Sequence, residues 1–277
     1  MKRSKTNTGF LYFLEKILRS HPLVYFIFRQ FIIYTNIFEE DANGVVFLNL
    51  DQKVNIIDVG ASDGIASKFF ERKLKINKII CYEPNKSYVR ILKKLNIKNL
   101  IVKSYGVGQF NKYYNIFFPR YKFFSKNLDL ITYTYYNKQA LLNRINLDFK
   151  FKNNISIVKS KIYLKKIKKM RTKITLIKVD VNGHELSVLK GLSKIIKRDK
   201  PALIIETGED IKIIGRYLKK YGFEKYLFLN KYNKFMKIKK KLSIKHLLSA
   251  KKTFKAPYNM NINCYMMNKE FKYFNEQ

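Results

Sequence analysis

The chain has 277 residues, of which 47% are hydrophobic and 28% charged, and its formal net charge at pH 7 is +37. The hydrophobic content excludes a largely disordered chain, and the length suits one α/β domain with an extension. Two cysteines, Cys81 and Cys264, make neither a disulfide framework nor a zinc site. Both lie in apolar stretches, so we expect buried, reduced thiols in a cytoplasmic protein.

The positive charge comes mostly from lysines that are spread along the whole chain. Nucleic-acid and acidic-membrane binders carry such an excess, but specific nucleic-acid readers usually show clustered arginines. Asn, Ile, Phe and Tyr are also abundant and Trp is absent, which is the bias of an AT-rich genome. We therefore expect no specific nucleic-acid partner, and we expect RNA to bind weakly and without sequence preference.

Residues 1–50 are predicted to form an N-terminal helical extension, and residues 51–277 the main domain. Within the extension, residues 10–38 are apolar and aromatic but are interrupted by charges such as Glu15 and Arg29. This pattern predicts neither a signal peptide nor a transmembrane helix. Two alternatives remain, namely helices packed on the main domain or a basic, aromatic helix in peripheral contact with a membrane.

Residues 54–64 read Val-Asn-Ile-Ile-Asp-Val-Gly-Ala-Ser-Asp-Gly, and a helical pattern follows at 65–74. The order predicts a buried strand, a tight turn and a helix start, where glycines let a ligand approach free backbone N–H groups. Asp58 and Asp63 would repel a pyrophosphate but can hold an amine or a ribose hydroxyl. Ser62 stands where a dinucleotide motif has its second glycine. The stretch therefore favours a small adenosyl ligand with a cationic amino acid group, the alternative being a turn without a ligand.

Two further strands are predicted at 78–83 and 100–105, with a helix at 88–95 between them. The second strand ends in Glu83-Pro84, where an acidic side chain can accept both ribose hydroxyls. Alternatively, Glu83 only helps to start the helix, because proline fits a first helical turn. The third strand ends at Gly106, where a kink would let the backbone lie against an adenine ring.

Residues 110–154 interrupt this alternation and are crowded with tyrosine and phenylalanine. We interpret them as hairpin strands within a surface insertion. Their aromatic rings either stack on a sugar or another planar acceptor, or they form a satellite core.

The βα order returns at residues 174–191, where an apolar central strand ends at Asp180 and a helix follows at 185–192. A fifth strand at 201–206, a helix at 210–220 and closing strands at 223–229 and 261–267 complete the pattern. Ligands of open parallel sheets bind beyond the carboxyl ends of the strands. Asp58, Glu83 and Asp180 should therefore converge on one edge.

Four motifs together carry a family resemblance: Asp58-Val-Gly-Ala-Ser-Asp-Gly64, Tyr82-Glu-Pro-Asn85, Ile177-Lys-Val-Asp-Val-Asn-Gly-His-Glu185 and Ala202-Leu-Ile-Ile-Glu206. Over residues 55–206 the chain resembles the FkbM family of S-adenosylmethionine-dependent methyltransferases. The resemblance implies an α/β, Rossmann-like class I methyltransferase sheet of seven strands with an antiparallel last strand. It also implies O-methyl transfer to sugar or polyketide hydroxyls, with S-adenosyl-L-methionine as cofactor.

Carried over by position, Gly60, Ala61 and Gly64 would face the methionine part of the cofactor, and Asp180 would lie near the reacting methyl group. The family usually has Glu where this chain has Asn182, which can donate and accept hydrogen bonds but cannot take a proton. The full set of predicted cofactor-binding residues is Asp58, Gly60, Ala61, Ser62, Asp63, Gly64, Glu83, Pro84, Gly106 and Asp180.

The predicted catalytic residues are Asp180, His184 and Glu185. A sulfonium methyl is already activated, so the protein must align the acceptor oxygen and remove a proton. His184 is the best candidate base because the ordinary histidine pKa is about 6.5. Alternatively, His184 only orients Glu185 or Asp180. A divalent cation held by these three residues and Glu206 is a further alternative, and we predict no metal.

The predicted function is O-methyl transfer to a hydroxyl of a sugar, a glycan or a similar small molecule. An RNA methyltransferase and a non-catalytic cofactor-binding relative are the alternatives. Amine-methylating enzymes of nucleobases are expected to have Asn-Pro-Pro-aromatic after the fourth strand, but this chain has Asp180-Val-Asn-Gly183. The sequence leaves the oligomeric state open.

Overall fold

The computed structural model describes residues 27, 40–50, 53–123, 126–130, 133–148, 154–207, 211–239, 262–269 and 271. The helices predicted within residues 10–38 lie outside this part of the chain, except for Ile27. Among the described residues, no helix is both long enough and apolar enough to span a bilayer.

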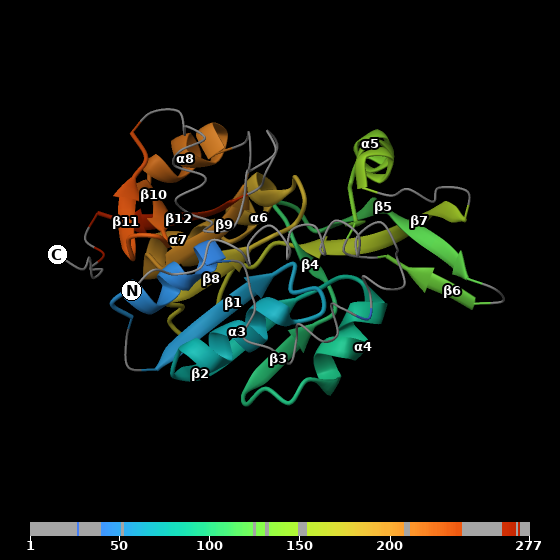
Figure 1. Cartoon of the computed structure of the whole chain (residues 1–277). Coiled ribbons are helices and arrows are strands. Elements are labelled where there is room, and N and C mark those ends of the chain that lie inside the picture. The colour runs from blue at the N-terminus through green and yellow to red at the C-terminus, as the bar shows by residue number, and fades with distance from the viewer. Residues whose placement is uncertain are drawn as a thin grey trace, which may run out of the picture. The chain divides into compact units, whose positions relative to one another are not determined.

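The main sheet has eight strands in the order β11-β10-β12-β9-β8-β1-β2-β3 (Figure 1). The five strands from β9 to β3 pair in parallel, whereas β12 is antiparallel to both β9 and β10. The antiparallel last strand is therefore confirmed, and the short β11 adds an eighth strand that the sequence did not predict. The strands are β1 (Val54–Val59), β2 (Ile76–Tyr82), β3 (Leu100–Lys103), β8 (Leu176–Val179), β9 (Ala202–Thr207), β10 (Phe223–Leu229), β11 (Lys234–Lys237) and β12 (Ile262–Asn268).

The two faces of this sheet are covered by different helices. Alternate strand residues point to opposite faces, so Ile57 packs with α6, α7 and α8, and Ile56 packs with η1 and α3. The helix predicted at 185–192 is confirmed as α6, and the short helix α7 that follows it was not predicted. The helices are η1 (Glu40–Phe47), α3 (Ile65–Lys73), α4 (Lys86–Lys94), α6 (Glu185–Gly191), α7 (Ser193–Asp199) and α8 (Ile211–Lys219).

The 3₁₀ helix η1 is fastened to the last strand by buried polar groups. The carboxylate of Asp41 accepts hydrogen bonds from the backbone and the side-chain nitrogen of Asn263, at 3.0 and 2.9 Å. The hydroxyl of Tyr265 lies 3.0 and 2.8 Å from the carbonyl oxygens of Asp41 and Ala42. These bonds join residues more than 220 positions apart in the sequence.

A second sheet has the strand order β4-β7-β5-β6. Antiparallel pairing of β5 with β6 confirms the predicted hairpin, but the helix α5 was not predicted. Backbone contacts divide the chain into two compact units, one of 38–113, 162–252 and 256–277, the other of 1–37, 114–161 and 253–255. The remaining elements are β4 (Gly106–Val107), β5 (Lys112–Phe123), β6 (Lys126–Asp129), α5 (Lys138–Asp148) and β7 (Ile155–Lys165).

The unit that contains residues 114–161 has a small core of its own. Leu130, Tyr133, Leu141 and Ile145 are buried there, and rings such as that of Tyr121 pack against them. For these aromatic residues the satellite-core interpretation is confirmed.

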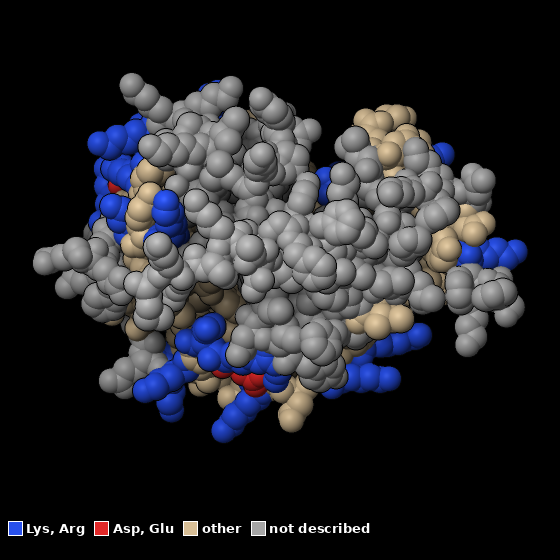
Figure 2. All heavy atoms as spheres, in the orientation of Figure 1, with Lys and Arg blue, Asp and Glu red and all other residues tan. Residues whose placement is uncertain are grey.

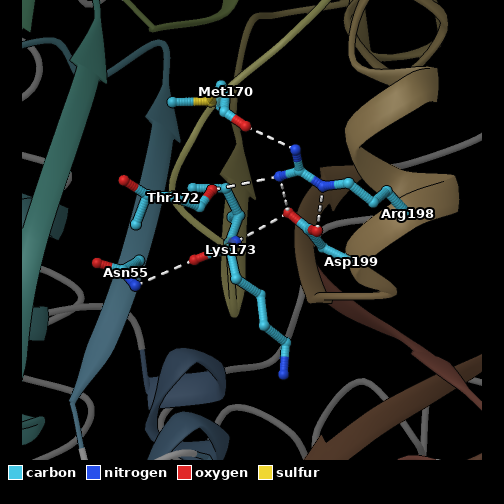
Figure 3. Close-up of polar contacts among 7 residues, drawn as sticks. Asn55, Met170, Thr172, Lys173, Arg198 and Asp199 are labelled. Carbon is cyan, nitrogen blue, oxygen red and sulfur yellow. Dashed lines mark hydrogen bonds and ion pairs between the residues drawn. The ribbon is translucent and has the colours of Figure 1, made fainter.

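The loop before β8 is fastened to the end of α7 by what we call the amino-end clasp (Figure 3). Arg198 donates to the carbonyl oxygens of Met170 and Thr172 at 2.6 and 3.2 Å. It also forms two hydrogen bonds, of 2.5 and 2.7 Å, with the carboxylate of Asp199. The same carboxylate accepts the backbone N–H of Ile174 at 2.9 Å. The clasp therefore fixes the chain where β8 begins.

Candidate active site

The strand order of the main sheet changes direction between β1 and β8, because β1 lies between β2 on one side and β8 on the other. Ligands of open α/β sheets bind at such a point, beyond the carboxyl ends of the strands. Asp58 lies near the end of β1, and Glu83 and Asp180 directly follow β2 and β8. The three carboxylates share one edge, as the sequence predicts.

The glycines of the turn after β1 are required by close packing. Gly60 has φ +78°, and a Cβ atom there would lie 1.8 Å from the carbonyl oxygen of Asp180. Gly64 has φ +85°, and its Cβ would lie 2.2 Å from the side chain of Leu95. Ser62, between them, also has a positive φ of 52°. Side chains at the two glycines would therefore strain the turn and push β1 from β8 and α3 from α4.

Glu83 joins this turn to the end of β2. One carboxylate oxygen accepts the backbone N–H of Ser62 at 2.9 Å, and the other accepts that of Asn85 at 2.8 Å. Burial raises the pKa of Glu83 to about 7, although these two hydrogen bonds act in the opposite direction. Each carboxylate oxygen has lone pairs for more than one hydrogen bond, so Glu83 can still accept from a ligand.

Asp58 is fully buried and forms a hydrogen bond on one side only. Its Oδ2 accepts from the hydroxyl of Ser67 at 2.7 Å, and that hydroxyl also lies 3.1 Å from the thiol of Cys81. Its Oδ1 and the hydroxyl of Ser62 are buried without a hydrogen-bond partner among the described residues. Burial raises the pKa of Asp58, and Lys178 opposes that rise. Buried oxygens of this kind call for a partner that the described part of the chain does not supply.

Lys178 is a site residue that the sequence analysis missed. Its side chain is 4% exposed, and its ammonium group lies 2.9 Å from the carboxylate of Asp180. It pairs with Asp58 in the register of β1 and β8, and the charges of Asp180, Asp58 and Glu206 raise its pKa against the effect of burial. A lysine within the apolar strand Leu-Ile-Lys-Val was the available signal, since buried lysines require partners.

The turn from Asn182 to Glu185 leads into α6. Asn182 has φ +51° and Gly183 has φ +95°. Asparagine enters this left-handed region more readily than other residues with a side chain, so Asn182 suits the turn where the family usually has Glu. The carboxylate of Glu185 is buried and accepts the N–H of Gly183 at 2.9 Å. Burial, and then the charge of Lys112, lowers the pKa of His184.

The other predicted site residues lie around this edge in different settings. Ala61 and Asp63 are buried in the turn. Gly106 lies in β4, where a Cβ would be 2.4 Å from Leu164 and 3.5 Å from Pro84, so packing explains this glycine. Within the described residues, no three His, Cys, Asp or Glu side chains lie close enough together to hold a metal ion.

Residues 58–225 match the family described as the methyltransferase FkbM domain. The chain belongs to the FkbM methyltransferase family. The match covers the carboxylates after β1, β2 and β8, the turn into α6, and β9, and it confirms the family inferred from the motifs. No curated protein matches the chain.

Several solved structures are similar to the FkbM chain. A methyltransferase FkbM from Methylobacillus flagellatus KT is 19% identical with a TM-score of 0.36, over 57% of this chain and 34% of its own length. An rRNA methylase from Streptococcus thermophilus is 10% identical with a TM-score of 0.41, over 82% of this chain and 92% of its own length. M. capricolum TrmK in complex with S-adenosylhomocysteine is 12% identical with a TM-score of 0.36, over 83% of this chain and 68% of its own length.

The protein is an S-adenosylmethionine-dependent methyltransferase of the FkbM family. Its carboxyl edge fits that cofactor, because the buried oxygens of Asp58 and Ser62 that have no partner in the described part of the chain are acceptors suited to an ammonium or a hydroxyl group. Asp58 and Asp63 would hold the amine, and Glu83 would hold the ribose hydroxyls. We call Asp58, Ser62, Glu83, Asp180 and Glu185 the carboxyl rim.

Proposed function

We propose that the protein transfers a methyl group to a hydroxyl oxygen of a sugar, a glycan or a similar small acceptor. The observation that supports this proposal best is His184, a half-buried imidazole between Asp180 and α6 whose pKa is lowered by burial and by Lys112. Such an imidazole is neutral at cellular pH and can accept the proton of a hydroxyl group.

The roles of the neighbouring residues follow from their contacts. When bound, the cofactor supplies a sulfonium methyl group, whose C–S bond electrons leave with sulfur as the acceptor oxygen bonds to the carbon. His184 takes the hydroxyl proton on a ring nitrogen. Asp180 forms an ion pair with Lys178, and Glu185 accepts the N–H of Gly183, so both carboxylates hold in place the turn that carries His184. Asn182 has no part in proton transfer.

Labelled cofactor and a panel of sugars and nucleotide sugars would test the proposal, with methyl transfer to oxygen detected by mass spectrometry. We expect transfer to hydroxyl acceptors, and we expect Asp180→Asn to lower kcat more than it lowers affinity for S-adenosylhomocysteine. The amide is the better variant than alanine because it keeps a hydrogen-bond acceptor near the buried Lys178. Transfer only to nitrogen, or no transfer despite cofactor binding, would contradict the proposal.

An RNA acceptor is the second candidate, and the net charge of +37 favours it. On the face shown in Figure 2, however, Lys and Arg side chains of the described residues occur in separate groups, such as those near β2 and α3 and those near β10 and β11. RNA binding is expected to be weak and to fall steeply as salt rises. A tight, sequence-selective complex at physiological salt would favour RNA instead.

A further inference from the structure

The segment Gly108–Tyr113, here called the acceptor segment, is attached to the helix that begins directly after His184. The backbone N–H of Gln109 donates to the hydroxyl of Ser187 in α6 at 3.1 Å. A Cβ atom at Gly191, the last residue of α6, would lie 2.3 Å from the carbonyl oxygen of Gly108. The backbone of the segment is therefore packed directly on α6, and its position is set by the same helix that follows the candidate base.

This segment exposes two aromatic rings and a cation. Phe110 is 55% exposed and Tyr113 is 62% exposed, and both are among the few large hydrophobic side chains left exposed in the described residues. The ammonium group of Lys112, an exposed residue, lies 5.8 Å from the centre of the Phe110 ring. The ring of Tyr113 packs on that of Tyr163 at a centroid distance of 5.1 Å, which holds it in place.

The charge of Lys112 reaches the candidate base, because it contributes to the lowered pKa of His184. More basic residues lie at the end of the neighbouring strand β7. Lys166 donates its backbone N–H to the side chain of Asn111 at 2.7 Å, and the ammonium of Lys165 lies 5.5 Å from the centre of the Tyr105 ring. Through Lys112 and the packing of the acceptor segment on α6, this basic surface is linked to a site whose other charged groups are mostly carboxylates. A neutral acceptor needs no cation there, whereas an anionic acceptor does, because the carboxyl rim would otherwise repel it.

We propose that Phe110, Lys112 and Tyr113 form an acceptor subsite for a sugar that carries a negatively charged group, either a phosphate or a carboxylate. This inference rests on the proposed function, since it names the class of acceptor for the same site. The aromatic rings pack against the apolar face of the sugar, and Lys112 binds its anionic group with a charge-assisted hydrogen bond.

Matched forms of the same hexoses test this inference: the neutral methyl glycoside, the 1-phosphate and the uronate. Each would be titrated into the full chain saturated with S-adenosylhomocysteine, and each would be offered as a methyl acceptor. We expect at least one charged form to bind about 10-fold more tightly than its neutral match, and Lys112→Ala to remove that difference. Phe110→Ala should instead weaken the neutral and charged forms alike. The phosphate and uronate arms distinguish the two sources of charge.

Lys98→Ala is the control, because Lys98 is also exposed but precedes β3 at the opposite edge of the sheet. It should leave all affinities unchanged. Equal affinity for neutral and charged forms, no binding of any form, or equal effects of Lys98→Ala and Lys112→Ala would overturn the inference. Charged forms that bind through Lys112 but are never methylated would contradict the proposed function while supporting this subsite.

Discussion

The carboxylate of Asp199 at the amino edge of the main sheet and that of Asp58 at its carboxyl edge differ in how fully their oxygens are hydrogen-bonded. At the amino end of β8, the side chain of Asp199 is 4% exposed and accepts hydrogen bonds from Arg198 and from the N–H of Ile174. At the carboxyl end of β1, Asp58 is 0% exposed, yet its Oδ1 has no partner among the described residues and burial raises its pKa. Burial alone therefore does not separate structural carboxylates from functional ones. We expect the state of their hydrogen bonds to separate them, because the described residues satisfy Asp199 and leave Oδ1 of Asp58 without a partner.

The largest effect is expected at the carboxyl edge, from His184→Ala. Loss of a general base should lower kcat by about 10²- to 10⁴-fold, while affinity for S-adenosylhomocysteine and the free energy of unfolding stay close to those of the wild type. Because the pKa of His184 is lowered, the acidic limb of the wild-type kcat profile should lie below pH 6.5. An unchanged limb in the variant would show that another group is the base.

The next effect is expected at the amino edge, from Asp199→Ala. The change leaves the buried N–H of Ile174 without its acceptor, and it should lower the free energy of unfolding by about 1–3 kcal/mol in urea titrations. The partly exposed pair with Arg198 should add little. Asp199→Asn, which keeps an acceptor, should recover part of the loss. Cofactor affinity of the folded fraction should not change, and a large decrease would mean that the two edges are coupled.

Asp58→Asn makes the matched substitution at the carboxyl edge, and we expect the reverse pattern. A neutral amide avoids burying a charge, and Lys178 retains Asp180, so the free energy of unfolding should change by less than about 1 kcal/mol. Calorimetry should show affinity for S-adenosylhomocysteine lowered by about 10-fold, as for the loss of one charge-assisted hydrogen bond. Lost stability with unchanged affinity would place Asp58 in the same structural class as Asp199.

The smallest effect is a pH dependence from Glu83. Its pKa is raised from 4.5 to about 7, so the folded state binds more protons than the unfolded state between those values. Stability from this group should therefore fall as pH rises through that window. Ribose hydroxyls donate best to the ionised carboxylate, so cofactor affinity should rise by about 10-fold from pH 6 to 8. A flat profile for Glu83→Gln would confirm the assignment, and a slope that persists in this variant would assign the pH dependence to another group such as Asp58.

Much of the site's position was predictable because three strands end in acidic residues at one edge. Asp58, Glu83 and Asp180 each follow or close an apolar run, and parallel strands bring such ends together. The main sheet was predictable for the same reason, since its strands are short apolar runs separated by helical patterns.

Other parts carry no local signal. The close approach of the Gly60 backbone to the carbonyl oxygen of Asp180 depends on the pairing of β1 with β8. The position of Lys178 beside Asp58 depends on the register of the same two strands. Neither can be read from one segment. The helix α5 has polar and apolar residues on all sides, so its periodicity is weak, and β4 has only two residues. In such segments, contacts distant in sequence decide the structure.

The place of β12 has a consequence for synthesis of the protein. This strand lies between β9 and β10, and Asn263 and Tyr265 within it bond to Asp41 and Ala42 near the start of the described chain. While the ribosome is still translating the codons before residue 262, β9 and β10 each present an unpaired edge. Unpaired strand edges can pair with those of other nascent chains. Folding is also slow when strands that are distant in the sequence must pair, as β12 does with β9. We expect the sheet to close only after translation of β12, so that the nascent chain depends on chaperones until then.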